Sequence, residues 1–141
     1  MYNVTNVAGR LCVSTLVPPV TGEEISKFGE VWMHLMAGRK ERVIVFGDYT
    51  RARLVDPHVR QLLTSFFNAG NPDVERSGIL VTAESSLIFE QFASIIRGSM
   101  HPSRRIFKDP HLLEEWLGEV MTDEERASLK LVLRERFGGE P

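Results

Sequence analysis

Asp48 and Asp56 are the residues of this chain whose type and spacing most directly suggest chemistry. Asp48 closes the apolar run at residues 43–46, and ligands of open α/β sheets bind beyond the carboxyl ends of strands. Two carboxylates at one crevice could bind a cation or transfer protons. The simpler interpretation is structural. Asp56 precedes Pro57 and would be the N-cap of a helix, and Asp48 would accept hydrogen bonds from backbone N–H groups of its loop.

Three hydroxyl groups could accept phosphate near helix N-termini, where free N–H groups and the helix dipole favour an anion. Thr50 lies in the loop before the Asp56 helix, which makes it a possible phosphorylation site. Ser85 and Ser86 precede another apolar periodic segment, and we predict that one of them is its N-cap.

The familiar catalytic and metal-binding motifs are not found in the sequence. The four histidines lack HExxH spacing, and no CxxC, GxSxG, GxGxxG or GxxxxGK[ST] motif occurs. We therefore predict no metal and no cofactor. His58 follows Pro57, so we expect it in an exposed first helical turn. An enzyme that uses Asp48 with Arg51 or His58 is kept as an alternative.

The composition indicates an ordinary globular protein. Hydrophobic residues make up 43% of the 141 residues and charged residues 26%, and the net charge of -2 gives no general attraction to nucleic acid. The one cysteine, Cys12, cannot form an intrachain disulfide and fits a reducing compartment. No apolar run approaches the roughly 20 residues of a transmembrane helix. These features predict a cytoplasmic protein without a membrane span.

Charge is distributed unevenly along the second half of the chain. Residues 97–108 contain four basic residues and no acid, namely Arg97, Arg104, Arg105 and Lys108. Residues 109–125 contain seven acids and no Lys or Arg. This layout could attract a protein partner or pair two copies head to tail, as in a homodimer. The alternative is solvated surface with acids at helix starts.

The order of predicted elements is β-β-α-β-α-β-α-β-α-α. Strands are predicted near residues 2–7, 11–17, 43–46, 78–82 and 105–107. Helices follow capping signals at Thr21, Asp56, Ser85 or Ser86, Asp109 and Thr122. Alternating strands and helices predict an α/β fold with a mixed, mostly parallel five-strand sheet. We predict one domain over residues 1–137 and a flexible tail over residues 138–141.

The strand that ends near Asp48, the short loop and the helix capped by Asp56 resemble the STAS family of anti-sigma-factor antagonists. The element order also resembles that family, with one additional C-terminal helix. The stretch 105–109, followed by Trp116-Leu117, is similar to divergent STAS-like proteins of bacteria. In the family a phosphorylatable serine follows the capping aspartate. Here that position is Pro57, which has no hydroxyl.

The resemblance implies a regulatory domain that meets a partner kinase or regulator near the Asp56 helix. The implied contact residues are Asp48, Tyr49, Thr50, Arg51, Asp56, Pro57, His58 and Arg60. Together with Arg97, Arg104 and Arg105 they form our predicted partner-binding set. The leading hypothesis is a non-enzymatic bacterial signalling or scaffold domain without the serine switch. The alternative is a module that binds a small apolar or lipid ligand between sheet and helices, in a pocket lined by the apolar third helix. Residues predicted to be buried are Val45, Phe66, Ile79, Val81, Phe92 and Trp116.

Overall fold

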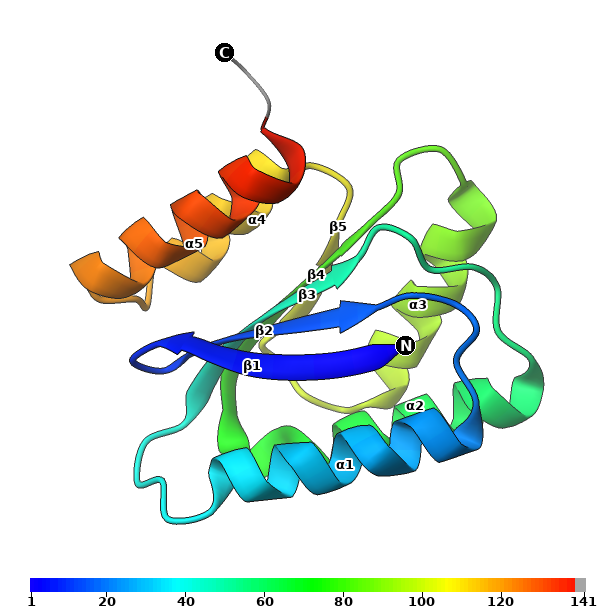
Figure 1. The fold of residues 1–141 in the computed structure, drawn as a ribbon. Coiled ribbons are helices and arrows are strands. Elements are labelled where there is room, and N and C mark those ends of the chain that lie inside the picture. Colours follow the sequence, from blue (N-terminus) through cyan, green and yellow to red (C-terminus); the bar gives the residue numbers. More distant parts are fainter. Residues whose placement is uncertain (139–141) are drawn as a thin grey trace.

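A computed structural model describes residues 1–138 and shows one five-stranded sheet with helices on both faces (Figure 1). The predicted element order is confirmed. In chain order the elements are β1 (Tyr2–Ala8), β2 (Leu11–Leu16), α1 (Gly22–Met36), β3 (Val43–Tyr49), α2 (Pro57–Gly70), a 3-10 turn (Asn71–Asp73), β4 (Val74–Val81), α3 (Ser86–Gly98), β5 (Arg104–Phe107), α4 (Pro110–Gly118) and α5 (Asp123–Phe137).

The strands lie in the order in which they occur in the chain, β1-β2-β3-β4-β5. β1 pairs antiparallel with β2, and the other three pairs are parallel. The predicted mixed, mostly parallel sheet is therefore confirmed. The three parallel connections run through α1, α2 and α3, which cover one face, and α4 and α5 cover the other (Figure 1).

Helix starts follow the capping signals of the sequence. Asp56 accepts a hydrogen bond from Val59 N at 2.9 Å, and Pro57 occupies the first helical position. Ser85, not Ser86, is the N-cap of α3. The capping box at Thr122 is complete because Glu125 also accepts from Thr122 N. Thr21 caps α1 by accepting a hydrogen bond from Glu24 N at 3.2 Å. The Glu24 carboxylate, which would complete a capping box, lies 3.3 Å from the N-terminal ammonium instead.

The two faces of the sheet carry separate cores. The core under α1–α3 is rich in aromatic residues, including Phe28, Trp32, Phe67 and Phe92. The core under α4 and α5 is largely aliphatic, with Leu113, Leu117, Leu129 and Leu133. Burial is confirmed for Val45, Ile79, Val81, Phe92 and Trp116. Phe66 was predicted to be buried but is only half-buried, because Phe67 is the aromatic residue of this pair that α2 turns into the core.

Two strands are longer than predicted. β3 continues to Tyr49, so Asp48 and Tyr49 belong to the strand and not to the loop. β4 begins at Val74, four residues before the predicted start, because Val74, Arg76 and Ser77 pair with β3. No helix within residues 1–138 is long and apolar enough to cross a bilayer. Apart from Gly138, the expected tail lies outside the described residues.

Candidate functional site

Asp48 lies at the carboxyl end of β3 and is 8% exposed. One carboxylate oxygen accepts hydrogen bonds from Thr50 N at 3.2 Å and Thr50 Oγ1 at 2.7 Å. The other oxygen accepts from Arg136 of α5 at 2.8 Å, and Arg136 also donates to Thr15. The last turn of α5 thus closes over Asp48. This contact was not predicted, because 88 residues separate Arg136 from Asp48 in the chain.

Asp48 and Asp56 serve different elements. Asp56 caps α2, whereas Asp48 holds the β3–α2 loop and the end of α5. Tyr49, also expected at a partner surface, is 1% exposed, and its hydroxyl lies 2.5 Å from the Tyr2 hydroxyl. Tyr49 is therefore a core residue. Its predicted surface role is wrong, because the strand continues through residue 49 and turns the ring under the helices.

The β3–α2 loop presents most of the other predicted contact residues to solvent. The exposed residues of the loop are Arg51, Arg53, Leu54 and Asp56. Pro57, His58 and Arg60 in the first turn of α2 are also exposed, and Arg60 donates to Ser94 on α3. Ala52 is 1% exposed and anchors the loop in the core. Gln91 of α3 fixes the backbone of Val55 through two hydrogen bonds of 2.9 and 2.8 Å. The loop is therefore an exposed surface with a defined conformation.

An open groove of about 630 Å³ runs along this carboxyl edge of the sheet between the β3–α2 and β4–α3 loops. Its lining includes Thr50, Arg51, Arg53, Ser85 and Ile88. Leu54 in the β3–α2 loop and Leu87 in the first turn of α3 are 56% and 68% exposed. The groove lining also includes Glu84, so the edge combines two cationic groups, one carboxylate and apolar groups.

The basic residues of the second half do not form one surface. Arg104 and Arg105 follow each other in β5, so their side chains point to opposite faces of the sheet. The Arg104 guanidinium lies 5.1 Å from the Phe67 ring under α2, and that of Arg105 lies 5.0 Å from the Trp116 ring on α4. Arg104 is 8% exposed, so its predicted role in an exposed contact surface is wrong. Arg97 and Arg105 are exposed.

The acidic stretch is largely used within the chain. Four of its seven acids form ion pairs, which are Glu114–Lys130, Glu119–Arg76, Asp123–Arg126 and Glu125–Arg10. Glu125 is 2% exposed and contacts both the guanidinium and the backbone N of Arg10. Burial alone would raise the pKa of Glu125, but the bonds from Arg10 and from the Thr122 backbone lower it overall. These ion pairs connect four of the seven acids to α5, β4 and the β1–β2 turn.

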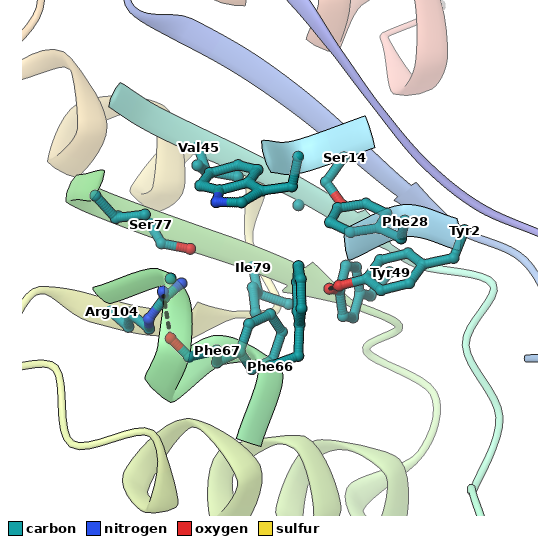
Figure 2. Close-up of a pocket in the computed structure, with 14 residues that line it drawn as sticks. Tyr2, Ser14, Phe28, Val45, Tyr49, Phe66, Phe67, Ser77, Ile79 and Arg104 are labelled. Carbon is teal, nitrogen blue, oxygen red and sulfur yellow. Dashed lines mark hydrogen bonds between the residues drawn. The ribbon is translucent and has the colours of Figure 1, made fainter. Parts of the chain in front are cut away.

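A cavity of about 30 Å³ lies between the sheet and helices α1 and α2 (Figure 2). The cavity forms because Ser14, Gly47 and Ser77, which have a small side chain or none, lie on neighbouring strands beneath large aromatic residues. α3 contributes nothing to its lining, in contrast to the expected pocket along the third helix. The missed signal was the presence of small polar residues in otherwise apolar strands.

Arg104 is the charged residue of this cavity. Its Nε donates to Asn71 Oδ1 and its Nη2 to the Phe67 carbonyl, both at 3.1 Å, the latter drawn in Figure 2. Burial lowers the pKa of Arg104 to about 10, so the guanidinium remains a cation at neutral pH. Trp32 Nε1 and Ser14 Oγ, both fully enclosed, have no hydrogen-bond partner within residues 1–138.

Tyr2 and Tyr49 close the other end of the cavity, away from Ser77 and Arg104 (Figure 2). Burial raises the pKa of Tyr49 to about 12, while the hydrogen bond with the Tyr2 hydroxyl acts in the opposite direction. Burial also raises the pKa of Tyr2. Both tyrosines are therefore neutral hydroxyl groups that can donate a hydrogen bond.

Within residues 1–138 no group of three or more His, Cys, Asp or Glu side chains could hold a metal ion. No family model, curated protein or solved structure matches the chain. The resemblance to the STAS family therefore rests on the sequence features alone.

Proposed function

We propose that this chain is a non-enzymatic, STAS-like regulatory or scaffold domain that binds another protein through the β3–α2 loop. The observation that carries the proposal is the exposure of Arg51, Arg53 and Leu54 on a loop fixed by Ala52 and Gln91. A loop already held in one conformation loses little entropy on binding.

The chemistry of this edge favours a partner segment that is acidic and partly apolar. Arg51 and Arg53 supply positive charge at the groove, and Leu54 and Leu87 offer apolar surface beside it. Because Pro57 has no hydroxyl, we propose that binding is not switched by phosphate at the start of α2. As part of the same proposal we place the protein in the bacterial cytoplasm; the free, buried Cys12 supports the reducing compartment and the STAS-like sequence features support the bacterial origin.

The test compares two double charge reversals in the tagged protein. Arg51→Glu with Arg53→Glu changes the carboxyl edge of the sheet. Lys40→Glu with Arg42→Glu makes the same charge change in the exposed loop before β3, at the opposite edge. Affinity purification from the native host with mass spectrometry identifies the partner, and calorimetry with purified components then measures its affinity.

The carboxyl-edge variant is expected to weaken binding about tenfold or more, because attraction becomes repulsion at the interface. The control variant is expected to bind like the wild type. Both should melt near the wild-type temperature, since all four residues are exposed. If both variants bind the partner with the affinity of the wild type, the β3–α2 loop is not part of the interface.

A second candidate function is small-ligand binding, favoured by the cavity under α1 and α2. Its volume of about 30 Å³ is far below the roughly 300–1,000 Å³ of sites for larger ligands. The cavity thus favours an occupant much smaller than the apolar or lipid ligand expected from the sequence.

A further inference from the structure

Arg104 is a buried cation without an anionic partner in the part of the chain that the structure describes. Its hydrogen-bond acceptors, Asn71 Oδ1 and the Phe67 carbonyl, are both neutral. None of the eight ion pairs formed within residues 1–138 includes Arg104. Buried charges in proteins are normally paired, because removal of a charge from water is costly. A negative charge near the Arg104 guanidinium would therefore stabilise this arrangement.

The cavity beside Arg104 brings a second donor to the same place. A Cβ atom built on Gly70 would lie 3.6 Å from Trp32 Nε1 and 4.0 Å from Arg104 Nη2. One point in space is thus close to both nitrogen donors. Trp32 Nε1 can only donate, and it has no acceptor within residues 1–138. An acceptor between Trp32 and Arg104 would satisfy both groups.

The remaining polar groups of the cavity are hydroxyls. Ser77 is paired in register with Arg104 on the neighbouring strand, and the two lie on the same side of the cavity in Figure 2. Ser14 Oγ is enclosed and unpartnered, and the Tyr2 and Tyr49 hydroxyls line the far end. Among the described residues that line the cavity, none is Asp or Glu. The site thus offers positive charge and hydrogen-bond donors but no competing carboxylate.

The cavity size limits the occupant. About 30 Å³ holds one or two water molecules or a group of similar size. A phosphate ester or a nucleotide is much larger, and a fatty acid would displace several aromatic side chains of the core. Only an anion of about one to three non-hydrogen atoms agrees with both the charge and the volume.

We propose that this cavity binds one small monovalent anion, of the size of chloride or formate, between the Arg104 guanidinium and the Trp32 indole N–H. Such an anion would neutralise the buried cation and accept the hydrogen bond that Trp32 leaves unused. A water molecule fits the same space and also accepts hydrogen bonds, but it leaves the charge of Arg104 uncompensated. The site lies under α1 and α2, so the proposal does not depend on the protein-binding loop.

The two tryptophans of the chain provide a direct test with an internal control. Trp32 lines the cavity, whereas Trp116 belongs to the core on the opposite face. The ¹⁵N-labelled protein is exchanged into sodium gluconate, whose anion is too large for the cavity. Sodium chloride or sodium formate is then titrated in at constant ionic strength. The Trp32→Phe variant assigns the two indole N–H signals.

The Trp32 indole signal is expected to shift in a saturable manner, with a dissociation constant in about the millimolar range for so small a ligand. The Trp116 signal should stay in place. Crystals grown in sodium bromide should show anomalous scattering beside Arg104. A Trp32 signal that responds to neither chloride nor formate would overturn the proposal and assign the cavity to water.

Two matched pairs of variants locate the site. Arg104→Met should abolish the saturable Trp32 shift, whereas Arg105→Met, which changes the adjacent residue on the opposite face, should retain it. Gly70→Ala places a methyl group at ordinary contact distance from Trp32 Nε1 and should weaken anion binding at least tenfold without removing the charge. Gly118→Ala, at the end of α4, is its control. If Gly70→Ala and Arg104→Met bind chloride and formate like the wild type, the anion does not occupy this cavity.

Discussion

Each face of the sheet buries a charged residue, but only one of these two charges has a partner of opposite charge within residues 1–138. Under α4 and α5, Glu125 is 2% exposed and is surrounded by Arg10 and by the backbone N of Thr122. Under α1 and α2, Arg104 is 8% exposed, touches neutral acceptors and an aromatic ring, and borders a cavity.

The comparison separates a structural charge from a candidate site. Glu125 completes its capping box and ties α5 to the β1–β2 turn through Arg10, so its bonds account for its presence. Arg104 lacks a countercharge within residues 1–138, and Trp32 nearby lacks an acceptor. An uncompensated buried charge lowers the stability of the fold. A role of Arg104 in binding an anion therefore explains its burial better than a role in folding.

The largest expected effect concerns packing on the cavity side. Phe92 is completely buried and meets the Tyr49 ring at 5.5 Å, edge to face. Phe92→Ala should lower the free energy of unfolding by about 3–5 kcal/mol, measured by urea denaturation. A loss below about 1 kcal/mol would show that the core under α1–α3 is loosely packed around Phe92 as well as at the cavity.

The two buried charges should respond differently to the same substitution. Arg10→Met leaves Glu125 without its cation and should lower the free energy of unfolding by about 3 kcal/mol, because a broken buried pair leaves an unpaired charge. Arg104→Met removes a cation that has no acidic partner and should change stability by less than about 1 kcal/mol. Both values come from urea denaturation in gluconate. Equal losses in the free energy of unfolding would mean that Arg104 contributes as much to the stability of the fold as Arg10 does.

The smallest effect concerns pH. Because the pKa of Glu125 is lowered from its ordinary value of 4.5, its contribution to stability is present above pH 4.5 and is lost as pH falls through the folded-state pKa. We expect Glu125→Gln to be less stable than the wild type at neutral pH, and the difference to shrink as the pH falls below 4.5. Urea denaturation between pH 3 and pH 7 measures it. A stability difference that does not vary with pH would mean that Glu125 contributes through packing and neutral hydrogen bonds, and not through its negative charge.

Local signals in the sequence predicted the elements well. The caps at Asp56, Asp109 and Thr122 begin helices because each side chain accepts a hydrogen bond from a free N–H group within its own first turn. The apolar residues of β3 indicated a strand covered on both sides, and all of its residues are buried. Such signals involve residues a few positions apart, so the sequence alone determined the order of elements and the class of the fold.

The candidate sites depended on long-range placement. Whether Arg104 or Arg105 enters the core is decided by the pairing of Ser77 with Arg104, because side chains alternate between faces along a strand. The cavity forms where small residues of β2, β3 and β4 meet aromatic residues of two helices, and Asp48 is covered by an arginine 88 residues away. The sequence determined which residues are available, and only the tertiary structure decided which of them are buried together, because strand register and helix docking are properties of the whole chain.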